Sequence, residues 1–526
     1  MPTFSSSSSL LLLVLLLLSF LPFCRGDKQR QSYVLRALLV ACTLSSVLFI
    51  SQMLKGQSRP AKMRSMVAAE RAETTLRFMS IVNVGIAKAY EILTPISDSS
   101  GKAHKPIDLS NSGLNSYFRS ADKSLDLAIK SSPDDALLKA KRIILLSTWG
   151  RQKTLVKTLC KELQESKENK AAELGSTLSL IYLEPAALSK EALESESKVI
   201  EAGLSSGWYK ENALTALYKT SRQFKDYHAY QQSLEDRYFQ IFRMVLAMAV
   251  FVCFCAFIGL VVIVIQLGTL SRHDSAKVPE DDRLILDLSP LTVYSVFAAW
   301  ITCQLGIGEV FKLLPKNLLS LGGNPLGMAS FSLVSYLISM IPALLLIHFL
   351  AFKPRGLNFF KALRLRLRTP TLGPFKLIVS GFLTWCAIIP LVFVGAFVAS
   401  TYLGSQGSDN PVLPQIAAIA GSKNAAAIFI LLFTVAGLAP LCEEIIFRGF
   451  LYSAMRTRFG IFPAILISAF VFAGIHFDKG GSLMLFMLGP ALALAFDRTR
   501  SLLPSMLAHG LWNGGAFLVN VAIYCS

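Results

Sequence analysis

The stretch LCEEIIFRGF, residues 441–450, places two glutamates and an arginine inside a long apolar segment. A charged side chain at the centre of a bilayer costs at least about 2.5 kcal/mol on insertion scales, so such residues are rare there and are usually paired or functional. On a helix, Glu444 and Arg448 are four residues apart and face each other, whereas Glu443 points about 100° away from Glu444. The spacing predicts an ion pair between Glu444 and Arg448. It leaves Glu443 either as a general base or as part of a structural ion network.

The whole chain is too apolar for a soluble protein of its length. It has 526 residues, of which 53% are hydrophobic and 16% charged, with a mean hydropathy of +0.51. Several apolar runs are long enough to cross a bilayer. The formal net charge is +18, but the basic residues flank the apolar runs, as membrane topology requires, instead of forming one patch. The composition indicates a multi-pass membrane protein and argues against nucleic-acid binding.

The N-terminal half divides into two regions. Residues 1–54 contain a serine run followed by an apolar stretch of signal-peptide length, and then a second apolar run at 37–54 that can cross the membrane. We therefore expect a signal-like segment, whose cleavage stays open, and a membrane anchor. Residues 55–236 are soluble in composition and helical in periodicity. Within them, residues 120–141 match the spacing of a tetratricopeptide-type hairpin, which predicts an extramembrane helical-hairpin domain that either only packs or also recruits a partner.

Residues 237–526 form the predicted multi-pass region. Together with the anchor and the hairpin domain, it gives an all-α fold, a polytopic bundle of about eight membrane helices. The candidate spans are about 244–270, 289–312, 328–352, 376–402, 425–451, 461–477, 481–496 and 503–524.

Basic residues give the expected orientation of this bundle. The loops after the third, fifth and seventh spans are rich in Lys and Arg, which predicts that they face the cytoplasm. The C-terminus and residues 55–236 would then lie on the opposite side. Basic residues just beyond the anchor, at 55–64, favour the other orientation for residues 55–236, so the side of this domain stays open.

Two further membrane helices carry polar side chains. The sixth expected span ends in FVFAGIHF, with His476 one turn after Phe472, and the eighth contains MLAHGLWNGG, with His509 and Asn513 on one face. A lone histidine in an apolar helix is commonly a packing residue. Here, however, three helices each bring polar groups to membrane depth, where unpaired polar groups are costly. We therefore expect these groups to converge with Glu443.

Such a set points to the activation of water by one of two mechanisms. Glu443, His476 and His509 are candidate ligands of Zn²⁺, which would activate a bound water. Alternatively, Glu443 and His476 activate water directly, while His509 and Asn513 stabilise the developing oxyanion. The residue spacing does not choose between a metal site and a metal-free site.

The ordered motifs EExxxR (Glu443, Glu444 and Arg448), FxxxH (Phe472 and His476) and HxxxN (His509 and Asn513) resemble those of the CAAX-protease and bacteriocin-processing (CPBP, or Abi) family of intramembrane proteases. The resemblance places the protease core at about 374–524. It implies a metalloendopeptidase or glutamate-type peptidase with Glu443 as the water activator, and His476 as its partner or a ligand. It makes His509 and Asn513 oxyanion stabilisers or ligands, supported by Glu444 and Arg448.

The resemblance also implies partners and a location. The substrate would be a membrane-associated or CAAX-like protein or peptide, which is prenylated in some members of the family, and the lipid bilayer would surround the site. The flanks of the motifs resemble bacterial members, which favours the bacterial plasma membrane over the endoplasmic reticulum. The competing hypotheses are a non-catalytic membrane scaffold or bacteriocin-immunity-type protein on the same fold, and a transporter, which would predict inverted repeats that the spans do not show.

Overall fold

The computed structural model describes residues 61–93, 114–205, 207–273, 286–313, 324–403, 408, 410, 412–476, 478 and 480–524. The signal-like segment and anchor expected in residues 1–54 lie outside this part of the chain. Every regular element in the described ranges is a helix, so the expected all-α fold is confirmed. The described residues form two compact units. The membrane unit comprises those within 252–409 and 425–517, and the hairpin unit those within 59–251, 410–424 and 518–526.

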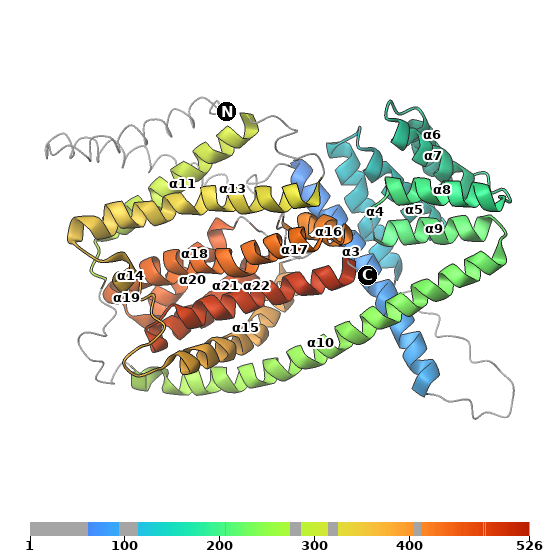
Figure 1. The fold of residues 1–526 in the computed structure, drawn as a ribbon. Helices are drawn as coiled ribbons and strands as arrows, with labels where there is room; N and C mark the ends of the chain where they lie inside the picture. Colours follow the sequence, from blue (N-terminus) through green and yellow to red (C-terminus); the bar gives the residue numbers. More distant parts are fainter. Residues whose placement is uncertain are drawn as a thin grey trace. The chain divides into compact units, whose positions relative to one another are not determined.

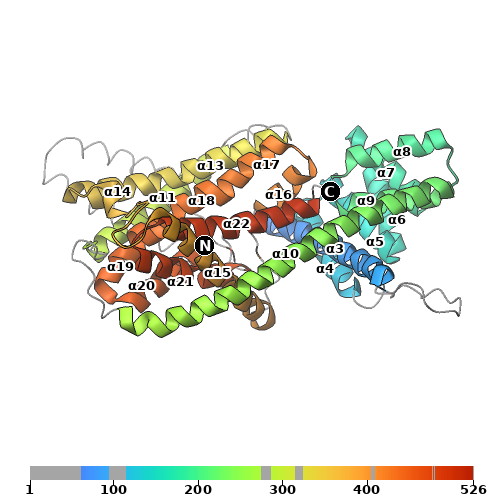
Figure 2. The same cartoon turned by 60° about the horizontal axis from the view of Figure 1, so that its bottom comes forward.

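Apart from the 33-residue α3, the hairpin unit consists of short helices that pack as neighbouring pairs (Figures 1 and 2). Local signals set their ends: the Asp135 carboxylate accepts a hydrogen bond from the Leu138 amide at the start of α5, and Gly150 ends that helix at φ 71°. Ala121, Leu125 and Ala128, which match the tetratricopeptide spacing within residues 120–141, are fully buried. The helices are α3 (Ala61–Leu93), α4 (Leu114–Ser131), α5 (Ala136–Trp149), α6 (Lys153–Gln164), α7 (Asn169–Tyr182), α8 (Lys190–Gly203), α9 (Trp208–Thr220) and α16 (Val412–Gly421).

The membrane unit is a bundle of long apolar helices (Figure 1). Helix α10 (Phe224–His273) belongs to both units, and so does α22 (Leu503–Tyr524). The other helices of the membrane unit are α11 (Pro290–Leu313), α13 (Pro325–Leu346), α14 (Phe359–Ala362), α15 (Pro374–Tyr402), α17 (Ala425–Leu432), α18 (Ala439–Glu444), α19 (Ser453–Phe459), α20 (Ile461–Ile475) and α21 (Ser482–Thr499).

Within the described residues, seven helices are long and apolar enough to cross a membrane, which makes the chain an integral membrane protein. They correspond to seven of the eight expected spans. The expected sixth span, 461–477, is present as α20, a shorter apolar helix of 15 residues. His476 directly follows the last residue of this helix as its C-cap, so the end of α20 decides where that side chain lies.

The helix that carries the glutamates is continuous but irregular. Between α17 and α19 it passes through two π-helical segments, η6 (Phe433–Leu438) and η7 (Ile445–Tyr452), with α18 between them. π-Helical segments inside α-helices are frequent at functional sites. Helix α13 runs beside this long helix in both views (Figures 1 and 2). Glu443 therefore lies in a short α-helical stretch between two register changes.

Helices α20 and α21 pack almost backbone to backbone. A Cβ atom added at Gly489 of α21 would lie 2.4 Å from the Cβ atom of Ala469 and 2.8 Å from its Cα atom. No real Cβ atom approaches another carbon so closely, so only glycine fits at this crossing. Because α20 carries Phe472 and His476, this contact fixes the helix that brings them to the site.

We expect Gly489→Ala to destabilise the protein by about 1–3 kcal/mol, because α20 and α21 must move apart to admit the methyl group. Gly515→Ala is the matched control, because a Cβ atom at Gly515 would meet no atom within 4 Å. Thermal unfolding of both variants in detergent measures the difference. A Gly489→Ala variant that unfolds at the temperature of the wild type would contradict the close crossing.

Candidate active site

The centre of the site is an ion pair with no exposure to solvent. Arg448 Nη1 donates to Glu444 Oε1 at 2.7 Å, and both side chains are 0% exposed. This is the pair that their spacing predicts. The guanidinium also lies over the ring of Phe472, with Arg448 Cζ 4.7 Å from the ring centroid. Removing one partner of such a pair would leave a buried charge uncompensated, at a cost of about 3–5 kcal/mol.

The ion pair holds one of the two histidines. His509 Nδ1 lies 2.9 Å from Glu444 Oε1, the same oxygen that accepts from Arg448. The carboxylate is an acceptor, so His509 Nδ1 carries the hydrogen. In the neutral ring Nε2 is then left with its lone pair, 3.8 Å from Glu443 Oε2. Glu444 thus fixes both the orientation and the tautomer of His509.

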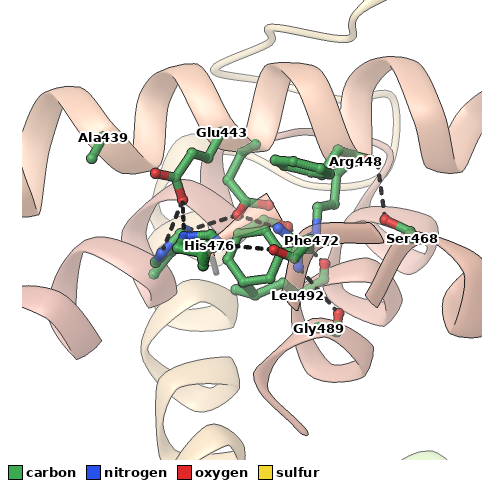
Figure 3. A network of polar contacts seen from close by, with 12 residues as sticks. Ala439, Glu443, Arg448, Ser468, Phe472, His476, Gly489 and Leu492 are labelled. Atoms are coloured by element: carbon green, nitrogen blue, oxygen red, sulfur yellow. Dashed lines mark hydrogen bonds and ion pairs between the residues drawn. The ribbon is translucent and has the colours of Figure 1, made fainter. Parts of the chain in front are cut away.

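The second histidine is held by backbone. His476 Nδ1 lies 2.7 Å from the carbonyl oxygen of Phe472, one turn earlier on α20. A carbonyl can only accept, so Nδ1 again carries the hydrogen. His476 Nε2 lies 3.9 Å from Glu443 Oε2, and Figure 3 shows the two side chains pointing toward each other. Both imidazoles therefore direct an Nε2 atom at one carboxylate oxygen.

Phe472 packs against both histidine rings and against Arg448. Its side chain is fully buried, with ring centroids 4.7 Å from that of His476 and 5.7 Å from that of His509, each in an edge-to-face arrangement. Its other contacts include Phe447. Phe472 is therefore an apolar support for both imidazoles and for Arg448. Figure 3 shows its ring beside His476 and Arg448.

Of the two adjacent glutamates, Glu443 is the one whose side chain is partly exposed. Its side chain is 12% exposed, against 0% for Glu444. Its Oε2 faces the two imidazoles, while its Oε1 accepts a hydrogen bond from the hydroxyl of Tyr336 at 3.1 Å. The distances of 3.8 and 3.9 Å to the imidazoles are too long for direct hydrogen bonds.

Sequence reasoning missed Tyr336. It lies on α13, in an apolar helix that carries no motif and no charged residue. Aromatic side chains are common in membrane helices, so the sequence contains no signal that separates this tyrosine from the others. Only the packing of α13 against the helix of Glu443 shows its contact with the site.

Asn513 lies on α22 one turn after His509, and its side chain bonds to the backbone of another helical segment. Its Nδ2 atom donates to the carbonyl oxygen of Val435 in η6 at 3.1 Å. In this segment the amide of Ala439 bonds to the carbonyl of Thr434, five residues earlier. In the same register the carbonyl of Val435 would pair with residue 440, which is a proline and has no N–H. Asn513 supplies the donor that Pro440 lacks.

Asn513→Ala should cost about 1–3 kcal/mol of stability, because the Val435 carbonyl loses its donor in an apolar setting. Pro440→Ala restores an N–H in register, so the same substitution should cost much less in a Pro440→Ala background. Unfolding free energies of the two single variants and the double variant give the coupling. Purely additive costs would show that Pro440 and Asn513 are independent.

The donor set suits zinc by chemistry, because His nitrogen and carboxylate oxygen are zinc ligands. Both Nδ1 atoms also donate to an oxygen, which is the arrangement typical of metal-ligating histidines. Zinc bonds of about 2.0–2.2 Å place tetrahedral ligands about 3.4 Å apart, so the separations of 3.8 and 3.9 Å are somewhat longer. Among the residues that the structure describes, no three or more His, Cys, Asp or Glu side chains lie close enough together to hold a metal ion.

Together, the fold and site define a class of protein: a polytopic helical membrane protein with one carboxylate and two oriented imidazoles converging between its helices. Residues 425–515, which contain these groups and Asn513, match the family model described as Type II CAAX prenyl endopeptidase Rce1-like. The match confirms the resemblance for this segment and supports a CAAX-type intramembrane protease at the level of the family. A search of curated proteins and a search of solved structures each found no match.

Proposed function

We propose that this chain is an intramembrane endopeptidase that hydrolyses a peptide bond of a membrane-associated protein, with Glu443 as the general base. One observation carries the proposal: Glu443 Oε2 faces the Nε2 atoms of His476 and His509 at 3.9 and 3.8 Å, while the other nitrogen of each ring is held by an acceptor. A water molecule placed between these atoms would contact the Glu443 carboxylate, which is the proposed base, and the Nε2 atoms of the two oriented imidazoles.

The proposed reaction begins with water held by Glu443 Oε2 and His476 Nε2. As the water oxygen attacks the carbonyl carbon of the substrate, its proton passes to Glu443. The tetrahedral intermediate then collapses: the C–N bond breaks, and Glu443 returns the proton to the leaving amine nitrogen. No covalent enzyme intermediate is needed, and Glu443 ends the cycle as a carboxylate.

His509 and Asn513 are the proposed stabilisers of the oxyanion. A protonated His509 ring would donate Nε2–H to the oxyanion while its Nδ1–H stays bound to Glu444. Asn513 has two amide hydrogens, and the Val435 carbonyl takes one of them. Glu444 and Arg448 support the site without touching the substrate.

A bound Zn²⁺ would be held by Glu443, His476 and His509 and would supply an activated water and a Lewis acid. The proton transfers described above do not depend on that ion.

The proposed substrate is a CAAX-like protein, prenylated or otherwise anchored in lipid, and the proposed location is the bacterial plasma membrane. The family match of residues 425–515 supports the class of substrate, and the flanks of the motifs, which resemble bacterial members of the family, are the ground for the location. The hairpin unit lies outside the matched segment. Its proposed role is to recruit or orient the substrate. A non-catalytic scaffold on the same fold is the alternative.

Glu443→Gln should lower peptide cleavage by about 10²–10⁴-fold, the usual contribution of a general base, without loss of folding. The assay uses purified protein in detergent with a farnesylated CAAX peptide and the same peptide without the farnesyl group. Glu184→Gln, at an exposed position of the hairpin unit, is the matched control and should cleave at the wild-type rate.

Metal analysis of the same preparations separates the two mechanisms. Stoichiometric zinc, with cleavage lost on chelation and restored by Zn²⁺, would establish the metallopeptidase. Metal-free protein that still cleaves, and stops only with Glu443→Gln, would establish direct activation by the carboxylate. Cleavage by Glu443→Gln at the wild-type rate would exclude Glu443 as the base and favour a different site.

A further inference from the structure

Tyr336 brings a fourth helix to the site from outside the matched segment 425–515. It lies near the middle of α13, a helix of 22 residues without a charged side chain. Its hydroxyl oxygen lies 3.1 Å from Glu443 Oε1 and 3.3 Å from the carbonyl oxygen of Ala439. None of the three sequence motifs includes it, and the proposed proton transfers do not use it.

The hydroxyl has a single hydrogen and two acceptors within reach. The carboxylate is the stronger acceptor, because hydrogen bonds to ionised groups are shorter and about twice as strong as those between neutral groups. The shorter of the two distances is also the one to Glu443. We therefore assign the O–H bond to Glu443 Oε1.

This bond distinguishes the two oxygens of the Glu443 carboxylate. Oε1 is held by α13, and Oε2 is left to face His476 and His509. A glutamate side chain has several rotatable bonds, and holding it in one geometry costs conformational entropy. A donor fixed on a neighbouring helix reduces the freedom of the carboxylate before a substrate arrives, which is how a base is kept in position for proton transfer.

We propose that Tyr336 is a positioning residue for Glu443: its hydroxyl holds Oε1 so that Oε2 stays directed at the two imidazoles. This inference rests on the proposed function for its kinetic consequence, but not for the hydrogen bond itself. It extends the site from the three motif helices to α13, and it makes the packing of α13 against α17 and α18 part of the active-site geometry.

The kinetic test compares Tyr336→Phe with Ser335→Ala, which removes a hydroxyl from the adjacent residue of the same helix. Tyr336→Phe should lower kcat about 10-fold and leave KM within about twofold, because the substrate does not touch this hydroxyl. Ser335→Ala should change neither constant. In a Glu443→Gln background, Tyr336→Phe should lower the residual rate by less than about twofold, because its effect acts through the carboxylate.

A change in KM with kcat intact, or a full 10-fold loss in the Glu443→Gln background as well, would overturn the positioning role. Either result would mean that Tyr336 acts on the substrate or on the fold and not on Glu443. Unfolding temperatures of the four variants show whether a loss of rate is a loss of folded protein.

A second readout does not depend on activity. Tyr336→Phe should lower the unfolding temperature of the otherwise wild-type protein, because the Glu443 carboxylate loses its donor. In a Glu443→Ala background, where that acceptor is absent, the same substitution should lower the unfolding temperature by less than half as much. Equal shifts in the two backgrounds would exclude the hydrogen bond even if no peptide is cleaved. A smaller shift in the Glu443→Ala background of a protein without peptidase activity would uphold the bond and reject only the proposed function.

Discussion

The buried pair of Glu444 and Arg448 is the interaction on which the site depends. Both side chains are fully removed from solvent, and the same Glu444 oxygen accepts from Arg448 and from His509. The arginine neutralises the carboxylate, which makes the charge tolerable at this depth. The carboxylate in turn holds the ring of His509 with Nε2 directed at Glu443. The ion pair therefore compensates the buried charges and also orients the imidazole of His509.

The irregular helix of the glutamates is the second constraint. Two π-helical segments flank the short α-helical stretch that ends at Glu444, and Pro440 removes one of the amides that would close the first. Backbone groups freed in a membrane must find partners. Asn513 satisfies the carbonyl of Val435 in η6, and the Ser468 hydroxyl donates to the carbonyl of Phe447 in η7 at 3.1 Å. Side chains from α22 and α20 thus stabilise the irregular backbone, and these are the helices that also carry the histidines.

The sequence predicts the helical membrane bundle and the convergence of three helices, because charges and histidines at membrane depth demand partners. Spacing alone also predicts the contact of Glu444 with Arg448. Two features lie beyond such reasoning. The role of Asn513 toward Val435 depends on a π-helical register that periodicity does not reveal, and the contact of Tyr336 depends on which helix packs beside α18. Helix α20 is also shorter than the span expected at 461–477, since apolar composition does not mark where that helix ends.

The Glu444–Arg448 pair has two roles: it neutralises a buried charge, and it orients His509. The most direct measurement is the unfolding temperature and cleavage rate of the Glu444→Met/Arg448→Met double variant, which leaves His509 Nδ1 without its acceptor, with Arg448→Met alone as reference. We expect Arg448→Met to be strongly destabilised, and the double variant to recover most of the stability but to cleave at least 100-fold more slowly than the wild type. A double variant that cleaves at the wild-type rate, or one no more stable than Arg448→Met, would contradict this double role of the pair.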